Sequence, residues 1–221
     1  MPIERKKIVK PYLLLCEGKD AENFLINYLE SEALTQDQRF SNEIQVLDFG
    51  GNDDLDRFLV NLKNMERFDQ VTSIAIIRDA EKDFAKACSD VTRSLRKSGI
   101  VSPGSYGTWV NDDTGVNVGY LLFPLNNEAG TLEDLCLNIL SESNIESILY
   151  SIDTFLTTME SFYGRSYHRK HKNRLHTYLS SSDEYVSMQL GLASKAGAFN
   201  WDSVYLEPLK RFLTEGFKAR G

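Results

Sequence analysis

Residues 8–30 read IVKPYLLLCEGKDAENFLINYLE, and this stretch decides the fold class. Its first part, Ile8–Cys16, is short and apolar, as in a buried β-strand, and Pro11 is acceptable near the start of a strand or on an edge. Its second part, Asp20–Glu30, places Phe24, Leu25, Tyr28 and Leu29 along one side of a helix. Asp20 stands where a helix N-cap belongs. The stretch therefore predicts a strand followed by a helix.

The same alternation continues as far as Gly99. Glu43–Phe49 and Val71–Arg78 are further predicted strands, and Asp53–Met65 and Lys82–Lys97 are predicted helices. Strands that alternate with helices form right-handed βαβ units, in which helices cover both faces of a parallel sheet.

After Gly99 the pattern changes. Two extended segments, Ser105–Val110 and Val116–Leu125, flank a turn and predict an antiparallel hairpin. From Gly130 onward four helices are predicted: Thr131–Leu140, Ile145–Tyr163, Tyr167–Leu179 and Val204–Phe217. The predicted fold class is α/β, with a Rossmann-like parallel sheet flanked by helices over residues 1–128. A mostly helical C-terminal region, residues 129–221, is expected to pack on this core.

The composition is that of a globular protein, with 42% hydrophobic and 26% charged residues, which excludes intrinsic disorder. No apolar run approaches the ~20 residues that cross a bilayer, and no signal-peptide pattern follows the basic first ten residues. We therefore expect a cytoplasmic protein without a membrane partner. Cys16, Cys88 and Cys136 are scattered, which favours free buried thiols over disulfides or a zinc site.

Carboxylates follow three successive predicted strands. Glu17 and Asp20 follow the first strand, Asp48 lies at the end of the second, and Asp79 and Glu81 follow the third. Parallel strands deliver such residues to one edge of the sheet, where ligands bind. Oxygen ligands suit Mg²⁺ or Mn²⁺, and clustered carboxylates repel one another unless a cation neutralises them. The combination predicts a site for Mg²⁺ or Mn²⁺.

Each of these carboxylates also has an ordinary structural explanation. Glu17 could be a polar residue at a strand end, Asp20 a helix N-cap and Asp48 a structural residue. Asp79 and Glu81 could be first-turn acids that interact favourably with a helix dipole. Only their combination at consecutive strand ends favours a functional site.

Two motifs, LLLCEGKDAENFL at 13–25 and IAIIRDAEKD at 74–83, resemble the Toprim fold of topoisomerases, primases and OLD-family nucleases. More closely, the chain is similar to an uncharacterised bacterial and archaeal Toprim-like family. Four motifs carry this similarity: Glu17–Glu22, Asp48–Asn52, Asp79–Glu81 and Gly130–Leu135. The chain departs from the pattern by having Asp-Ala-Glu in place of Asp-x-Asp, and Ala21 where an acid is common.

The resemblance implies a site that holds catalytic divalent metal. The implied metal ligands are Glu17, Asp20 or Glu22, Asp79, Glu81 and, later in the chain, Glu133. Glu17, Asp79 and Glu81 would be catalytic, and Lys19 or the basic helix described below would hold the phosphate.

Two later positions keep two interpretations each. Glu133 and Asp134 follow a plausible N-cap, Thr131, so they are either first-turn acids or, for Glu133, a metal ligand. Lys195 is either a cation of the site or a surface residue in a loop made flexible by neighbouring glycines.

Positive charge is concentrated in residues 165–176, RSYHRKHKNRLH. The whole chain has a net charge of −7, and outside this segment 20 basic residues face 32 acidic ones. The segment is predicted to contact the phosphates of a nucleic acid through five residues: Arg165, Arg169, Lys170, Lys172 and Arg174. It could equally be a solvated helix face or the partner of the acidic edge. Its histidines form no i, i+4 pair, which argues against zinc.

Three functions fit these features. The leading hypothesis is a Mg²⁺- or Mn²⁺-dependent nuclease that cleaves the phosphodiester bonds of DNA or RNA. The alternative is a Toprim-like binding or regulatory subunit, with little catalysis, that partners an ATPase in phage defence. A nucleotidyl transferase with the same metal cluster is a third. The chain has no Walker-type phosphate loop, which argues against ATP hydrolysis, and homo-oligomers are compatible with all three hypotheses.

Overall fold

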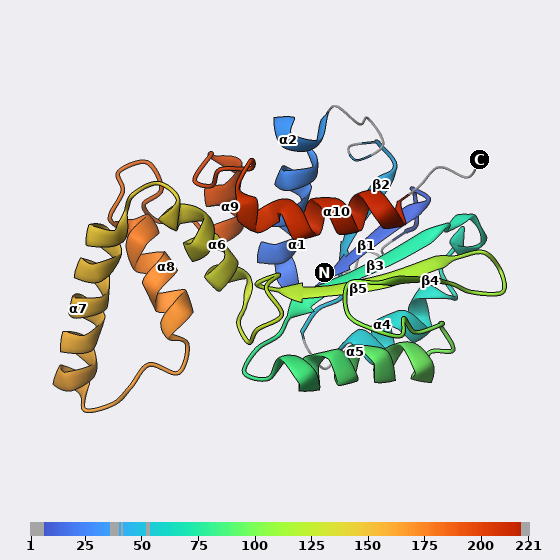
Figure 1. Ribbon diagram of the computed structural model, residues 1–221, viewed down its shortest axis with the longest axis horizontal. Coiled ribbons are helices and arrows are strands. Elements are labelled where there is room, and N and C mark those ends of the chain that lie inside the picture. The colour runs from blue at the N-terminus through green and yellow to red at the C-terminus, as the bar shows by residue number, and fades with distance from the viewer. Residues whose placement is uncertain (1–6, 36–39, 41, 52–53, 218–221) are drawn as a thin grey trace, which may run out of the picture.

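A five-stranded sheet forms the centre of the computed structural model, which describes residues 7–35, 40, 42–51 and 54–217 (Figure 1). The strands are β1 (Tyr12–Cys16), β2 (Ile44–Asp48), β3 (Ser73–Asp79), β4 (Trp109–Asn111) and β5 (Asn117–Phe123). Their order across the sheet is β2-β1-β3-β5-β4, and only β4 runs antiparallel to its neighbour. The predicted parallel sheet and antiparallel hairpin are both confirmed.

Helices connect these strands and form most of the C-terminal region. The first half contributes α1 (Gly18–Leu29), α2 (Glu32–Thr35), α4 (Leu55–Leu62) and α5 (Phe84–Lys97). The second half contributes α6 (Leu132–Ser141), α7 (Glu146–Tyr163), α8 (Lys170–Ser180), α9 (Leu190–Lys195) and α10 (Glu207–Gly216). Short 3₁₀ turns occupy Phe68–Gln70 and Val204–Leu206. The protein is thus α/β with a helical C-terminal region. None of the helices within the described residues is both long and apolar enough to span a membrane.

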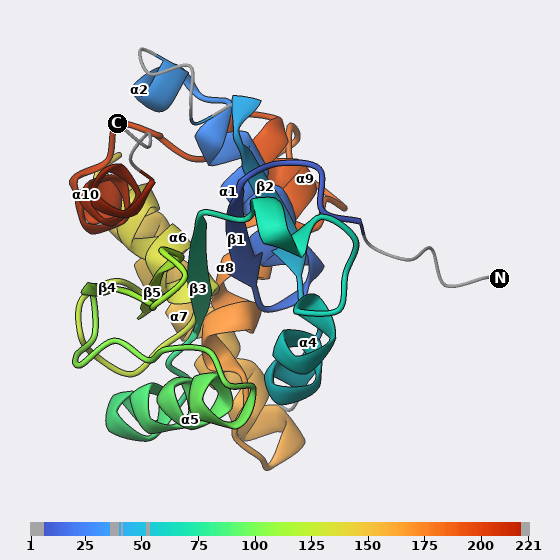
Figure 2. The ribbon, with the colours of Figure 1, turned by 90° about the vertical axis from the view of Figure 1, so that its right-hand side faces the viewer.

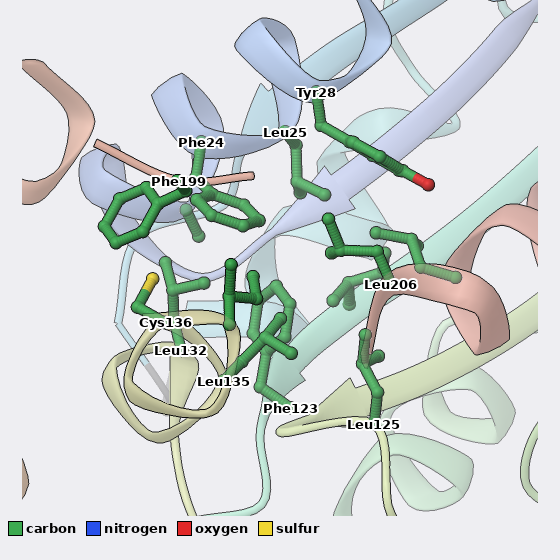
Figure 3. Packing of buried hydrophobic residues seen from close by; sticks show 14 of the residues in the cluster. Phe24, Leu25, Tyr28, Phe123, Leu125, Leu132, Leu135, Cys136, Phe199 and Leu206 are labelled. Carbon is green, nitrogen blue, oxygen red and sulfur yellow. The ribbon is translucent and has the colours of Figure 1, made fainter. Parts of the chain in front are cut away.

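Both faces of the sheet are buried, as a parallel sheet requires. On one face, Leu13, Leu15 and Ile76 pack against α4 and α5 (Figure 2). On the other face a larger core joins the sheet to α1 and to the C-terminal helices, with Phe24 and Phe123 at its centre (Figure 3). Residues before and after position 128 therefore share one hydrophobic core.

Several predicted helix starts are wrong: α8 begins at Lys170 and not at Tyr167, α10 begins at Glu207 and not at Val204, and two further differences bear on the site. Helix α1 begins at Gly18, so Asp20 lies inside its first turn and is not its N-cap. Helix α5 begins at Phe84, where the side chain of Asp83 accepts a hydrogen bond from Lys86 N at 2.9 Å. Asp79 and Glu81 consequently precede the helix and are not first-turn acids. Asn52 and Asp53, which belong to a predicted motif and a predicted helix start, lie outside the described residues.

The loop predicted around Lys195 is also wrong, because Leu190–Lys195 forms α9 against α1. Gly191 permits this contact: a Cβ at that position would lie 2.6 Å from Asn23 Cβ. The glycine serves close helix packing and not flexibility, and the exposed Lys195 ends the helix.

The last helix, α10, is fastened to the sheet by polar and aromatic contacts. Trp109 Nε1 donates to the Phe212 carbonyl at 3.0 Å, and the two rings stack with centroids 4.5 Å apart. Ser73 Oγ and Asn117 Nδ2 both donate to the Gly216 carbonyl, at 2.9 and 3.0 Å. These contacts close the C-terminal region onto the strands.

Gly216→Ala is predicted to destabilise the protein, because the added Cβ would lie 1.9 Å from the Trp109 ring. Overpacking of this kind costs about 1–3 kcal/mol, so we expect a lower melting temperature. Calorimetry or circular dichroism would measure the change, with Gly104→Ala, where a Cβ meets nothing within 4 Å, as the control. Equal stabilities of the two variants would contradict the importance of this contact.

Candidate functional site

The strand order places a topological switch point between β1 and β3. From β1 the chain moves outward to β2 and then returns to pair β3 on the other side of β1. Cys16 lies opposite Ile77 in this parallel pair, so Glu17, just after β1, and Asp79, at the end of β3, meet at the same edge. Ligands of open α/β sheets bind in the crevice outside such a point.

A cavity of about 760 Å³ opens at this edge. Its acidic wall comes from the strand ends, and its basic wall comes from the start of α8 and the segment before it. The lining residues are Glu17, Gly18, Gly50, Gly51, Asp79, Glu81, Lys82, Gly130, Thr131, His168, Arg169, His171 and Lys172. The structure thus brings together three of the predicted carboxylates and two of the five predicted phosphate-binding cations.

Asp48 shapes the cavity without lining it. Its Oδ1 accepts hydrogen bonds from Gly18 N at 2.9 Å and Gly50 N at 2.7 Å. Both glycines have positive φ, +83° and +98°, a conformation that favours residues without a Cβ. Asp48 therefore ties the turn after β1 to the turn after β2, which matches its structural interpretation.

Asp79 is held in place by the start of α6. Its Oδ1 accepts a hydrogen bond from Leu132 N at 2.9 Å. Burial, together with the neighbouring carboxylates Glu17 and Glu133, raises the pKa of Asp79 to about 8. Without a cation nearby, this carboxyl group retains its proton at neutral pH more readily than an exposed aspartate.

Glu81 reaches the cavity from an unusual backbone position. Its φ is +57°, and its N–H and carbonyl form two 2.8 Å hydrogen bonds with Gly130. This short antiparallel bridge connects the loop after β3 to the loop before α6. A left-handed conformation in a residue other than glycine, fixed by two backbone bonds, is typical of functional sites.

Glu17 is partly neutralised by a buried arginine. Arg78 Nε lies 3.6 Å from Glu17 Oε2, and Arg78 is only 2% exposed. Burial nevertheless raises the pKa of Glu17, against the lowering influence of Arg78. Glu17 Oε2 is buried and has no hydrogen-bond partner among the described residues. Sequence reasoning missed Arg78, although an arginine that ends an apolar strand is a signal for a buried ionic partner.

Glu133 contacts the cavity residue Lys172 without lining the cavity itself, whereas Asp134 completes the cap of α6. Asp134 Oδ2 accepts hydrogen bonds from Thr131 N at 2.9 Å and Thr131 Oγ1 at 3.1 Å, which completes a capping box for α6. Glu133 is 4% exposed, and its Oε1 lies 3.0 Å from Lys172 Nζ. Burial acts to raise the pKa of Glu133, but the bond to Lys172 outweighs it, so the net shift is downward.

The five predicted phosphate-binding residues separate into groups. Lys172 and Arg169 line the cavity. Lys170 pairs with Glu160 at 3.7 Å and Arg174 with Asp153 at 2.9 Å, both acids being on α7. Arg165 is exposed and forms no ion pair with any described residue. The interpretation as a partner of the acidic edge thus holds for Lys172. A further cation of the cavity, Lys82, was missed because it follows the third motif and carries no pattern of its own.

Besides Glu133 and the three basic residues Arg165, Lys170 and Arg174, the predicted residues Lys19, Asp20 and Glu22 lie outside the cavity lining. Lys19 is exposed and forms an ion pair with Glu22 on the same helix. Asp20 Oδ1 accepts a hydrogen bond from Gly191 N at 3.2 Å and so joins α1 to α9. Glu22 Oε1 accepts from Asp48 N at 3.2 Å. All three have structural contacts next to the site.

The sequence matches one protein family over almost its whole length. Residues 11–218 match the family described as "Protein of unknown function (DUF3226)". The chain belongs to this family. The match confirms the expected membership in an uncharacterised family. The matched range includes all residues that line the cavity, which we call the DUF3226 cavity. Comparisons with curated proteins and with solved structures gave no match.

The carboxylates of the DUF3226 cavity supply oxygen ligands but do not form a ready-made metal centre. Among the residues that the structure describes, no group of three or more His, Cys, Asp or Glu is already arranged to hold a metal ion. The donor set is nevertheless suitable in its chemistry, because it consists of carboxylate oxygens and includes the buried Glu17 Oε2, which has no hydrogen-bond partner among the described residues. The donor chemistry of these residues therefore suits a hard divalent cation, although their arrangement is not that of a preformed metal centre.

Asp79→Asn is predicted to change how stability depends on pH in the absence of divalent ions. The pKa of Asp79 is 3.8 in its unperturbed state and about 8 in the folded protein. Between these values the folded state binds more protons, so the free energy of unfolding falls as the pH rises from about 4 to about 8. Asparagine cannot ionise and avoids this loss. The variant should therefore melt at a higher temperature than wild type near pH 8, and the difference should shrink near pH 4.

Melting curves with a chelator present would measure this effect. Asp113→Asn, which alters an exposed aspartate outside the cavity, is the matched control. If the melting temperatures of Asp79→Asn and wild type differ by the same amount from pH 4 to pH 8, burial does not raise the pKa of Asp79.

Proposed function

We propose that the protein is a divalent-metal-dependent nuclease of Toprim type that hydrolyses phosphodiester bonds in DNA or RNA. One observation carries the proposal: a single cavity at the switch point has an acidic wall of Glu17, Asp79 and Glu81 opposite a basic wall that includes Arg169 and Lys172. The first wall suits a hard cation and the second suits phosphate. Phosphodiester hydrolysis needs both beside the same bond.

Glu17, Asp79 and Glu81 would hold Mg²⁺ or Mn²⁺. When bound there, such an ion supplies charge stabilisation to the phosphate and lowers the pKa of a water molecule. The raised pKa values of Glu17 and Asp79 arise first from burial, and they support this assignment because buried carboxylates that are costly to ionise favour a nearby cation. Glu133, whose Oε1 pairs with Lys172, would join them through its other carboxylate oxygen or by giving up that pair. Asp20 is left out, since it serves the contact with α9.

The basic wall would bind and orient the phosphate. Lys172 pairs with Glu133 and also lines the cavity. Its ammonium group can therefore leave the Glu133 carboxylate and bind a phosphate oxygen instead. Arg169 and Lys82 form no ion pair with the described residues, and both line the same cavity. Their guanidinium and ammonium groups would contact neighbouring phosphates of the strand. In this proposal Lys19 has no direct contact with the phosphate.

The resemblance to Toprim enzymes agrees with this arrangement. The motif that contains Glu17 follows β1, and the motif that contains Asp79 and Glu81 lies at the end of the adjacent parallel strand β3. These three acids therefore lie on one side of the cavity. Three free cysteines suit a reducing, cytoplasmic setting.

A second candidate function is a regulatory subunit with little catalysis that partners an ATPase. A specific observation favours it: the protein's own Arg78 and Lys172 already neutralise Glu17 and Glu133. Such pairs allow the acidic wall to persist without metal. In this case the cavity would bind nucleic acid, or a phosphate group of the partner, without cleaving it.

Glu17→Gln and Asp79→Asn are each predicted to reduce cleavage at least about 100-fold, because each removes a charged ligand. The assay would use single- and double-stranded DNA and RNA with Mg²⁺ or Mn²⁺, and Asp113→Asn should retain wild-type activity. Unaltered rates in both cavity variants would sink the nuclease assignment.

Thermal shifts distinguish the two candidate functions. A metal ion that binds only the folded protein stabilises it and so raises its melting temperature. At an ion concentration 100 times Kd the gain in the free energy of unfolding is about 2.7 kcal/mol. Mn²⁺ should therefore stabilise wild type but not Asp79→Asn. Absence of both cleavage and metal stabilisation would favour the regulatory subunit.

Arg169→Ala and Lys172→Ala are predicted to weaken the binding of a fluorescent oligonucleotide and to lower the salt dependence of its affinity, since each removes a phosphate contact. Anisotropy titrations over a range of salt concentrations would measure both quantities. Arg96→Ala, on the exposed side of α5, removes the same charge away from the cavity and is the control. Equal losses in all three variants would indicate a general effect of charge instead of binding in the cavity.

A further inference from the structure

Helix α7 forms an outer edge of the molecule and carries exposed apolar side chains. In Figure 1 it lies on the far side of α8 from the sheet. Leu149, Ile152 and Leu156 are buried on its inner side. A second row, Ile148, Phe155 and Phe162, is 44%, 51% and 78% exposed. We call these three residues the α7 stripe.

The spacing of the α7 stripe gives it a definite geometry. Its residues are seven positions apart, and two residues at this spacing differ by only about 20° in their direction around the helix axis. They therefore form a nearly straight apolar line along most of the 18-residue helix. Phe155 lies at the midpoint, with Ile148 and Phe162 at equal distances on either side.

The surroundings of the stripe are uncharged. Helix α7 contains no lysine or arginine, and after Glu146 its only acids are Asp153 and Glu160. Both of these pair with residues of α8, Arg174 and Lys170. The rest of the exposed surface from 147 to 162 consists of serine, threonine and apolar side chains. A solvent-facing helix in a chain with 26% charged residues normally carries charge, so this one is suited to being covered.

We propose that the α7 stripe is a homodimer interface in which α7 packs antiparallel against α7 of a second copy of the chain. The symmetric spacing makes the stripe complementary to itself: around a twofold axis at the midpoint, Phe155 meets Phe155 and Ile148 meets Phe162. Aromatic residues with few charges are typical of the centres of such interfaces.

Charge argues for this occupant over others. A nucleic acid or an anionic membrane would be recognised by lysine and arginine, which α7 lacks. A second copy presents an equally neutral surface, so no charge is buried unpaired. Helix α7 lies on the side of α8 away from the sheet (Figure 1), and none of its residues lines the cavity. The dimer is independent of the proposed nuclease activity.

Sedimentation equilibrium or light scattering over a series of protein concentrations would test the dimer. Wild type should have twice the mass of one chain, and Phe155→Glu should be a monomer because two buried carboxylates would face each other. Tyr150→Glu is the matched control: Tyr150 is a 74% exposed aromatic residue on a different side of the same helix. Unchanged far-UV circular dichroism would confirm that both variants fold. A monomeric wild type at its highest soluble concentration, or a dimeric Phe155→Glu, would overturn the proposal.

Cross-linking tests whether Phe155 lies at the contact between the two copies. In a Cys88→Ser background, which leaves only the buried Cys16 and Cys136, Phe155→Cys should form a covalent dimer on mild oxidation with diamide. Tyr150→Cys should remain monomeric under the same conditions. If Tyr150→Cys cross-links and Phe155→Cys does not, the stripe is not the contact.

Discussion

The parallel pairing of β1 with β3 is the constraint on which the site depends. Because Cys16 lies opposite Ile77, the turn after β1 and the end of β3 face the same space, and Glu17 and Asp79 must share it. The surrounding elements accommodate this proximity. Asp48 ties the two neighbouring turns together, and the first backbone N–H of α6 binds Asp79. The position of the C-terminal helices is thus coupled to the acidic strand ends.

The protein's own cations compensate the carboxylates at the cavity unequally. Arg78 compensates Glu17 and Lys172 compensates Glu133, while Asp79 is left with a pKa of about 8. Such a residual strain costs folding stability, and it is retained where a ligand relieves it. The nuclease proposal assigns that relief to a divalent cation. The regulatory alternative assigns it to the protonation of Asp79 and to the protein's own ion pairs.

Local patterns predicted the types of most elements because apolar spacing reports directly which side of a strand or helix is buried. The errors have tertiary causes. Asp20 has the composition of an N-cap, but its side chain binds Gly191 N, 171 residues away. The two glycines around Lys195 predict a loop, yet one of them, Gly191, serves close packing against Asn23. Arg78 and Lys82 carry no motif, so only the folded cavity shows their roles.

The sequence by itself determined the α/β alternation and the placement of Glu17 and Asp79 at strand ends, since both depend on residues close together in the chain. The tertiary structure decided the strand order, the pairing of Lys172 with Glu133 and the outward position of the α7 stripe. These features depend on contacts between segments far apart in sequence. Local propensity does not encode which distant surfaces meet, because many arrangements satisfy the same local patterns and only the packing of the whole core selects one.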